Sequence, residues 1–385
     1  MAQTAPPDWL EFLLTAAHRG EQGLLQGMHA VGLAGSASGQ PAWPFASRIA
    51  DDTLLIDYGY ARSVALALSV MAIVLLLVAI AIFWRRMRLP AAITTVLLCV
   101  VVPAPSASLL FAEAYPTTFH KSPTGFSAPS IKEGRRLYEK NCASCHGVGA
   151  AGDGVLADKL PKWPPTLTGG LLWQRTEGEL FWHIRHGMRD RGEVETMPGF
   201  QQELSDGGNW ALIDFLKANA AGSSVAQTGK WNYPVAAPGM LVRCREGRVI
   251  SLSELRGQNL RVVFGGGQLQ GLPEEPRLVT IAVTQGAFSG ADCVAEPAGI
   301  REAYALLSGV APDRLDGAQF LVDRSGWLRA RNFSGASEWS AADYLCTSTR
   351  AKDARVEITG GDGLGALIAR FDRDPVIAAR GRTWH

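Results

Sequence analysis

Two long uncharged stretches dominate the hydropathy pattern of the chain. Residues 63–84 and 89–112 contain no charged side chain and consist mainly of Val, Leu, Ile and Ala. A helix needs about 20 such residues to cross the hydrocarbon core of a bilayer. Pro103 and Pro105 interrupt the end of the second stretch, because proline breaks a helix interior. The pattern therefore predicts a transmembrane anchor of two helices over 63–112, of which the second is the weaker.

A short basic loop separates the two stretches. It contains Arg85, Arg86 and Arg88, and loops rich in Arg and Lys stay on the cytoplasmic side of a membrane. This orientation puts residues 1–62 and everything after about residue 113 in the periplasm, with the anchor in the inner membrane. An alternative interpretation takes the second stretch as a signal-like segment, with Ala112-Glu113-Ala114 as its cleavage site. Both interpretations export most of the chain.

The first 62 residues give a weaker signal. Apolar residues cluster at 9–14 and 24–28, which favours an amphipathic helix over Trp9–Leu33 that can lie on a membrane surface. His18 and His29 stand alone in this segment, and we expect isolated histidines to face solvent rather than to bind a ligand.

Downstream of the anchor, the periodicity changes from that of helices to that of strands. A linker at 113–130 precedes helical spacing at 131–138 and again at 210–216. After a second linker at 219–239, which contains Gly222-Ser223-Ser224, the pattern is that of strands with one helix. The strands are expected at 242–244, 248–252, 260–264 and 277–283, the helix at 301–307 and a hairpin at 320–331. The predicted fold is multidomain: two transmembrane helices, an all-α domain over 131–218, an α/β domain over 240–350 and a tail over 351–385.

Charge and composition exclude two classes of protein. Lys and Arg number 37 against 36 Asp and Glu, so the chain lacks the basic excess expected of a nucleic-acid-binding protein. Hydrophobic residues make up 47% and charged residues 19%, which excludes a chain that is disordered throughout.

The most specific chemical signal is the pentapeptide Cys142-Ala143-Ser144-Cys145-His146. The pattern Cys-x-x-Cys-His is that of covalent haem attachment. The two thiols form thioethers with the haem vinyl groups, and the histidine supplies a proximal ligand to the iron. A zinc site would need two further Cys or His residues at close spacing, and none follows. A thioredoxin-type redox pair would follow a buried strand, whereas the preceding residues predict a helix.

A sixth iron ligand is expected downstream of this motif. Met197 lies in Thr196-Met197-Pro198-Gly199-Phe200, where proline and glycine favour an irregular loop that could hold a thioether sulfur on iron. Met188, His186 and His183 are the competitors, and the two histidines lie on an apolar helix where packed side chains are commoner.

Two packing details complete this prediction. Leu212 and Phe215 of the closing helix should cross the opening helix at Gly134 and Tyr138, where glycine permits close approach. The stretch Pro164-Pro165-Thr166-Leu167 should offer a carbonyl to the imidazole N–H of the proximal histidine, a bond that orients a ligating ring.

These residues together resemble a known family. The motif at 142–147, Gly152-Asp153-Gly154, Leu180-Phe181-Trp182 and Met197-Pro198-Gly199-Phe200 are similar to the cytochrome c module fused behind bacterial copper-resistance-D-like membrane proteins. The resemblance covers roughly residues 40–347. It implies a class I cytochrome c fold with one covalent haem c, bound through Cys142 and Cys145, and with His146 and Met197 as axial ligands. The chain departs from that family in having two predicted spans rather than many, so copper transport does not carry over.

The α/β region resembles thioredoxin-like domains of the peroxiredoxin or copper-chaperone kind. Those domains carry cysteines directly after their central strand, where this chain has Gly265-Gly266-Gly267-Gln268-Leu269. Cys244, Cys293 and Cys346 match no such pair, so we expect no thiol-disulfide activity. A disulfide between Cys293 and Cys346 is one pairing that an oxidising compartment allows.

Two functions follow from these features. The first is a periplasmic carrier, anchored in membrane lipid, that passes single electrons to or from a redox partner protein such as an oxidase, a dehydrogenase or a copper protein. The second is a copper-handling or oxidase-assembly factor that acts through the thioredoxin-like domain. An enzyme would need an open sixth position on the iron, which Met197 argues against.

Overall fold

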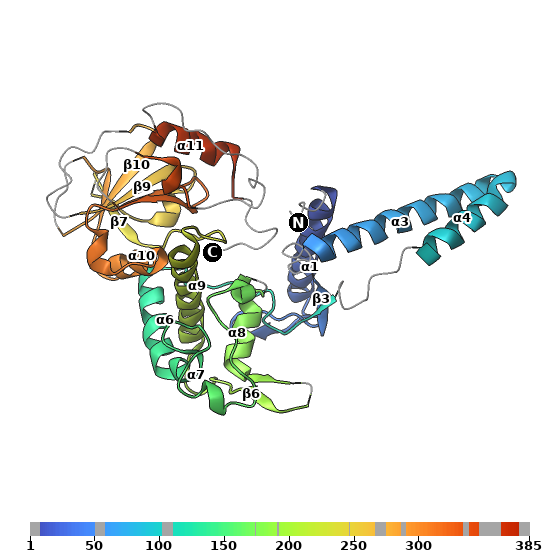
Figure 1. Ribbon diagram of the computed structural model, residues 1–385, viewed down its shortest axis with the longest axis horizontal. Helices are drawn as coiled ribbons and strands as arrows, with labels where there is room; N and C mark the ends of the chain where they lie inside the picture. The colour runs from blue at the N-terminus through green and yellow to red at the C-terminus, as the bar shows by residue number, and fades with distance from the viewer. Residues whose placement is uncertain are drawn as a thin grey trace. The chain divides into compact units, whose positions relative to one another are not determined.

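The structure is a computed structural model that describes residues 8–50, 58–101, 111–173, 175–190, 192–245, 247–265, 275–285, 290–333, 339–345 and 363–376. The chain divides into two compact units, 1–119 and 120–385. Figure 1 shows the helices and strands of both units, and each unit is described here by itself.

The described part of the first unit contains three helices. They are α1 (Asp8–Ala30), α3 (Tyr58–Phe83) and α4 (Arg88–Val101), and a single 3-10 turn, η1 (Arg85–Met87), joins the last two. Four short strands form two antiparallel pairs: β1 (Ser36–Ala37) with β2 (Gln40–Pro41), and β3 (Ser47–Ile49) with β4 (Phe111–Glu113). The amphipathic helix predicted near the N-terminus is therefore present as α1.

One helix of the described chain is long and apolar enough to cross a membrane. It is Ser63–Phe83, and the side chains of its most apolar 18-residue window are not buried by the rest of the protein. The second predicted span is shorter as a helix, because α4 ends at Val101 and residues 102–110 lie outside the described part. Ala112, expected at the end of that span, instead pairs with Arg48 in a strand. The expectation for His18 was also wrong, since its side chain is 4% exposed and its ring contacts Phe119.

The second unit begins with a helical region. Its helices are α6 (Ala128–Asn141), α7 (Ala143–His146), α8 (Glu177–His186) and α9 (Asp206–Thr228), with 3-10 turns η2 (Ala157–Lys159) and η3 (Gly170–Trp173) and the paired strands β5 (Met188–Arg189) and β6 (Glu195–Met197). Side chains cap the helix starts: Ser127 accepts a hydrogen bond from the Ser130 N–H, and Ser205 accepts one from the Gly208 N–H.

Helices α6 and α9 pack as the sequence predicts. A Cβ atom on Gly134 would lie 1.9 Å from the carbonyl oxygen of Ala211, so only glycine permits this approach. Beside it, the rings of Tyr138 and Phe215 lie 5.1 Å apart between centroids. Leu212 is buried in the same cluster.

The rest of the second unit is a sheet of seven strands. They are β7 (Leu241–Cys244), β8 (Val249–Ser251), β9 (Asn259–Phe264), β10 (Leu278–Val283), β11 (Cys293–Ala295), β12 (Gln319–Val322) and β13 (Leu328–Asn332), in the spatial order β13-β12-β9-β10-β11-β7-β8. Strands β9, β10 and β11 are parallel, whereas β12 is antiparallel to β9 and β7 to β11. Strand β11 was not predicted. The other strands and α10 (Ile300–Ser308) lie where the pattern placed them.

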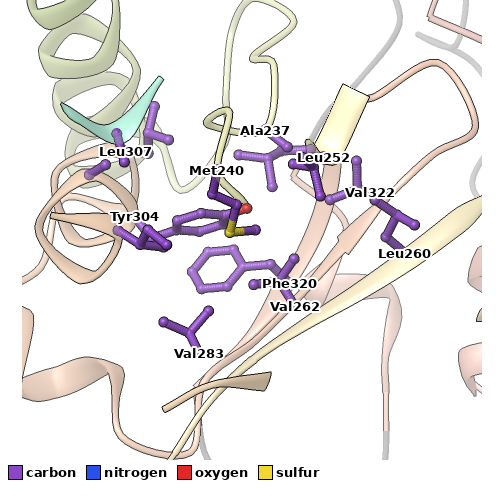
Figure 2. Close-up of a cluster of buried hydrophobic side chains, with 14 of the residues drawn as sticks. Ala237, Met240, Leu252, Leu260, Val262, Val283, Tyr304, Leu307, Phe320 and Val322 are labelled. Carbon is purple, nitrogen blue, oxygen red and sulfur yellow. The ribbon is translucent and has the colours of Figure 1, made fainter. Parts of the chain in front are cut away.

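The sheet and the helical region share a continuous apolar core. Tyr304 of α10 and Phe320 of β12 lie 4.9 Å apart between ring centroids, and Met240 lies beside them (Figure 2). The same cluster includes Ile131 of α6 together with Ala218, Ala221 and Val225 of α9. The indole N–H of Trp231 donates to the Leu307 carbonyl at 2.9 Å.

This shared core corrects the predicted linker at 219–239. Helix α9 continues to Thr228 and includes Gly222-Ser223-Ser224. The Gly and Ser content of this stretch had predicted a linker. The helix persists because Ala221 and Val225 are each 3% exposed and pack against the sheet. Burial of apolar side chains outweighs the low helix propensity of Gly and Ser.

The predicted tail also contains structure. Residues 363–373 form α11 (Gly363–Arg373), whose Leu367, Ile368 and Phe371 pack beside Leu321 of the sheet. The buried guanidinium of Arg329 donates to Asp323 and to the Asp374 carbonyl, which joins the segment after α11 to the β12–β13 turn. The turn lies within the predicted hairpin at 320–331, and in it the Asp323 carboxylate accepts from the Ser325 and Trp327 N–H groups.

The disulfide pairs differently from the expected one. Cys293 bonds to Cys244, not to Cys346, and the latter lies outside the described residues. The pairing follows from sheet register, because Cys244 on β7 and Cys293 on β11 are directly opposite each other.

Candidate functional site

The haem-attachment motif lies where α6 passes into α7. Cys142 follows the last residue of α6 and precedes the first of α7, and its φ of −120° interrupts the helical backbone between them. The His146 N–H donates to the Cys142 carbonyl at 2.9 Å, which closes one helical turn and brings the residues of the motif together. Cys142 and Cys145 are both free thiols. Burial, together with the neighbouring Cys145, raises the pKa of the Cys142 thiol to about 12.

The chain after the motif folds back onto it. The Gly152 N–H donates to the His146 carbonyl, and the Leu156 N–H donates to the Ser144 carbonyl at 2.8 Å. The buried hydroxyl of Tyr138 on α6 donates to the Gly147 carbonyl at 2.6 Å. The motif is therefore fixed from one side by backbone N–H groups and from the other by the Tyr138 hydroxyl.

The proximal histidine candidate, His146, has one nitrogen turned into the protein. Its Nδ1 is buried and makes no hydrogen bond of normal geometry. Burial lowers the pKa of the imidazole, and the backbone of Pro165, which can only accept a hydrogen bond, acts in the opposite direction. The predicted carbonyl beside the imidazole is thus present at Pro165. A neutral ring of this kind is the form that ligates a metal.

Met197 is the last residue of β6, and the loop that follows it is held against the end of α8. The Phe200 N–H donates to the Ile184 carbonyl at 3.0 Å. Gly187 adopts a φ of 79°, and a Cβ atom there would lie 2.5 Å from the Met197 carbonyl oxygen, so this contact needs glycine. The Met197 side chain is half-buried and packs on the same apolar cluster as Cys142.

The competitor Met188 is a direct neighbour of Met197. The two residues face each other across the β5–β6 pair, and the Thr196 hydroxyl donates to the Met188 carbonyl. Helix α8 stops at His186, so Met188 belongs to β5 and not to the helix that carries the two histidines. Both thioethers are thus in the same part of the domain, a proximity that sequence spacing does not reveal.

Comparison with known proteins gives an independent result. Residues 129–216 match the family described as "Cytochrome C oxidase, cbb3-type, subunit III". This region carries a c-type cytochrome domain. Proteins of the cytochrome c family bind haem c covalently and take part in electron transfer, and the free thiols of Cys142 and Cys145 fit that chemistry.

The similarity to individual proteins is narrower. A cbb3-type cytochrome c oxidase subunit CcoP from Azospirillum sp. (strain B510) is 37% identical over 68 residues, which are 17% of this chain and 20% of that protein. Among solved structures, the Kuenenia stuttgartiensis reducing HAO-like protein complex Kustc0457/Kustc0458 is 22% identical over 28% of this chain and 51% of the other. Its TM-score of 0.23 is too low to show a shared fold.

The two histidines of α8 make contacts of their own in the cytochrome domain. Burial, aided by Arg175 and His186, lowers the pKa of His183 to about 4. Its Nε2 accepts from the Arg175 guanidinium at 3.2 Å, because arginine can only donate. His186 is exposed, and its ring stacks on Trp182 at 3.8 Å between centroids.

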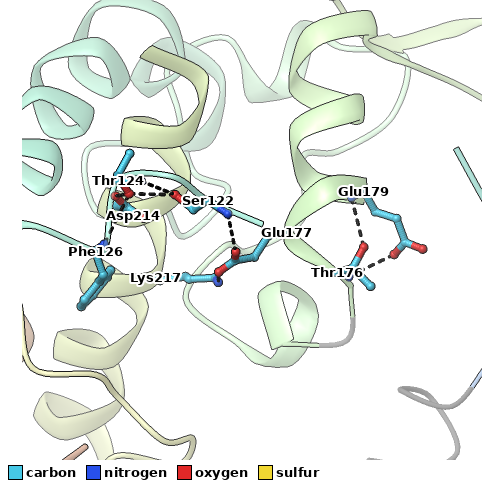
Figure 3. A network of polar contacts seen from close by, with 8 residues as sticks. All are labelled: Ser122, Thr124, Phe126, Thr176, Glu177, Glu179, Asp214 and Lys217. Carbon is cyan, nitrogen blue, oxygen red and sulfur yellow. Dashed lines mark hydrogen bonds and ion pairs between the residues drawn. The ribbon is translucent and has the colours of Figure 1, made fainter. Parts of the chain in front are cut away.

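A buried polar network in the cytochrome domain was not predicted (Figure 3). The carboxylate of Asp214 on α9 accepts from the Thr124 hydroxyl at 2.5 Å and from the Ser130 hydroxyl at 2.6 Å. Lys217, one turn further along α9, forms a buried ion pair with Glu177 of α8. Burial raises the pKa of Asp214 to about 6, against the opposing effect of its hydrogen bonds.

This network fixes the segment that enters the cytochrome domain. Glu177 also accepts from the Ser122 N–H, so the segment at 122–130 is bonded to both α8 and α9. The sequence offered no signal for it, since a lone Asp, Ser and Thr far apart in the chain follow no motif.

Proposed function

We propose that this chain is a membrane-anchored, periplasmic c-type cytochrome with one haem, and that it passes single electrons between partners of a respiratory chain. The observation that carries the proposal is the convergence of two separate segments. The motif at 142–146 and the Met197 loop pack on one apolar cluster of the cytochrome domain. Together they offer two free thiols, a half-buried imidazole and a thioether.

These four residues fit the needs of a haem c. Cys142 and Cys145 would hold the group covalently, and His146 and Met197 would supply ligands to its iron. Haem iron supplies one-electron chemistry, and a thioether ligand favours the ferrous state and raises the reduction potential. The protein's part is to bury the group and to orient the imidazole through Pro165.

Export of the cytochrome domain has two supports. The apolar helix Ser63–Phe83 is followed by Arg85, Arg86 and Arg88, which favour a cytoplasmic position for that end of the helix. The Cys244–Cys293 disulfide is stable in an oxidising compartment such as the periplasm. The apolar residues of α4 and beyond would return the chain to the periplasmic side as a second span.

The sheet region is proposed to be a thioredoxin-like domain that contacts a partner protein. Its strand order β13-β12-β9-β10, with β12 antiparallel to β9, supports this assignment. A redox role is not part of the proposal, because the cysteines of the described sheet are joined to each other rather than placed after β9.

An oxidase is the partner class we propose. Both the matched family and the Azospirillum protein bear the name of cbb3-type cytochrome c oxidase subunits. Copper handling has no comparable support, since the described residues hold no group of three or more His, Cys, Asp or Glu side chains that could bind a metal ion.

The paired methionines give the sharpest test of the haem site. Met197→Ala should abolish the sulfur-to-iron charge-transfer band of the oxidised protein and lower its reduction potential. The matched control is Met188→Ala, which should leave the band in place. A band that persists in Met197→Ala and disappears in Met188→Ala would assign the ligand to the neighbouring strand, and absence of the band in the wild type would exclude a thioether ligand altogether.

A separate experiment tests the proposed orientation of the chain in the membrane. Alkaline phosphatase fused after Leu89 should be inactive, and the enzyme fused after His385 should be active. The opposite result would reverse the proposed orientation without affecting the haem assignment.

A further inference from the structure

One face of α1 is apolar and turned away from the rest of its unit. Trp9, Phe12, Leu13 and Leu24 are 41%, 72%, 47% and 49% exposed. With 3.6 residues per turn, these positions fall on one side of the helix. The same side carries the small exposed residues Ala16, Gly20, Gly23 and Gly27. No charged side chain lies among these eight positions.

The opposite face of α1 holds the helix to the unit. Leu14 and Leu25 are 7% and 4% exposed. Leu14 packs against Val64 and Ala65 of α3, and Leu25 packs in a cluster with Trp43. The apolar outer face of α1 therefore takes no part in these two buried clusters.

The contact with α3 fixes the depth of α1 relative to the apolar helix. Val64 and Ala65 lie at the start of the stretch Ser63–Phe83. Figure 1 shows α1 running across the axis of α3. If α3 spans the bilayer, a helix that crosses its first turns lies along the membrane surface.

We infer that α1 is an interfacial helix whose outer face inserts into the boundary between phospholipid headgroups and acyl chains. This inference rests on the proposed anchoring by α3. A helix that lies in the interface needs an apolar face of aromatic and aliphatic side chains, and Trp9, Phe12, Leu13 and Leu24 supply it. An aqueous position would leave these four large side chains in water.

Charge indicates which lipid this face fits. Helix α1 contains Asp8, Glu11 and Glu21 against a single Arg19, so electrostatic attraction to anionic lipids does not hold it. Apolar insertion is the driving force, and zwitterionic phosphatidylcholine is a sufficient partner.

Site-directed spin labelling of the full chain in phosphatidylcholine vesicles tests the inference. A nitroxide is attached to Leu13→Cys on the apolar face, to Gln26→Cys on an exposed position outside it, and to Leu75→Cys within α3. The chain is loaded with haem, so that Cys142 and Cys145 are held as thioethers and take no label, and the background carries Cys99→Ser and Cys346→Ser. Collisions with oxygen, which dissolves in lipid, are compared with collisions with a water-soluble nickel complex.

We expect oxygen collisions to exceed nickel collisions at Leu13 and at Leu75, with the ratio reversed at Gln26. Nickel access at Leu13 with lipid exposure at Leu75 would overturn the inference and leave the anchor intact. Protection of Leu13 from both reagents would mean that protein, such as a second copy of the chain, covers the face, and would also overturn it. Nickel access at Leu75 would instead refute the proposed anchoring.

Discussion

The cytochrome domain and the sheet share an apolar core, yet they differ in how their cysteines are used. In the first, Cys142 and Cys145 are three residues apart on one helical turn and remain free thiols. In the second, Cys244 and Cys293 are 49 residues apart and are joined across two strands. The spacing of the cysteines along the chain therefore separates their roles. The pair on one helical turn is available to a cofactor, whereas the pair joined across two strands stabilises the fold.

The largest expected effect comes from the local pair. Cys142→Ser combined with Cys145→Ser should abolish covalent haem attachment, because no thiol remains to form a thioether. Mass spectrometry of the intact chain, after acid–acetone extraction, measures the attached haem. Cys244→Ser combined with Cys293→Ser is the matched control and should retain one haem per chain. Haem lost from the control as well would show that the two pairs are not independent.

The distant pair should instead affect stability. Cys244→Ser combined with Cys293→Ser should lower the free energy of unfolding by about 2–4 kcal/mol, since the bond constrains a long loop in the unfolded chain. Urea unfolding followed by circular dichroism measures the change. Cys346→Ser alone should have no such effect, and a comparable loss in that variant would restore the pairing expected from sequence.

The third prediction concerns the pH dependence of stability, which should arise from Asp214 in the cytochrome domain. The pKa of Asp214 rises from an ordinary 3.8 to about 6 on folding, so the folded state binds this proton more tightly than the unfolded chain. Its contribution to stability is complete below about pH 4 and is lost as the pH rises to 6. The loss corresponds to about 3 kcal/mol at most.

Asp214→Asn removes this titration. The free energy of unfolding of Asp214→Asn, relative to wild type, should therefore increase between pH 4 and pH 7, as measured by urea unfolding at each pH. The exposed Asp158→Asn serves as the control and should run parallel to wild type. A constant difference between Asp214→Asn and wild type would show that the carboxyl does not titrate in this range.

The smallest effect is at the helix crossing. Gly134→Ala introduces a Cβ atom that would lie 1.9 Å from the Ala211 carbonyl oxygen, and overpacking of this kind costs about 1–3 kcal/mol. The change is measured as a lower urea midpoint. At Gly149 a Cβ atom would meet nothing within 4 Å, so Gly149→Ala should stay close to wild type. Equal midpoints for the two variants would mean that α6 and α9 can separate without cost.

The parts of the site that are contiguous in sequence could be predicted, and those set by tertiary pairing could not. Cys142, Cys145 and His146 form one motif, and the approach at Gly134 follows from helical spacing. The pairing of Met188 with Met197 depends on a two-strand turn after α8 that leaves no periodic signal. Asp214, Thr124 and Ser130 meet only because α9 packs beside the entering segment.

The elements of the fold likewise fall into those that the sequence pattern predicts and those that it does not. Strands β9 and β10 are six residues each and apolar enough to be predicted, whereas β11 has only Cys293–Ala295. Without β11 the register that joins Cys293 to Cys244 could not be anticipated. Gly222-Ser223-Ser224 has the composition of a linker, and its helical conformation follows from the burial of Ala221 and Val225 on either side.

The length of α9 has a consequence for cooperativity. Phe215 of this helix belongs to the cluster beside the haem-attachment motif, and Val225, less than three turns away, belongs to the core of the sheet. A helix that contributes to two cores transmits the loss of one to the other, so both regions should unfold in a single transition. An absorbance change at the iron would then report the melting of strands that lie well outside the cytochrome domain.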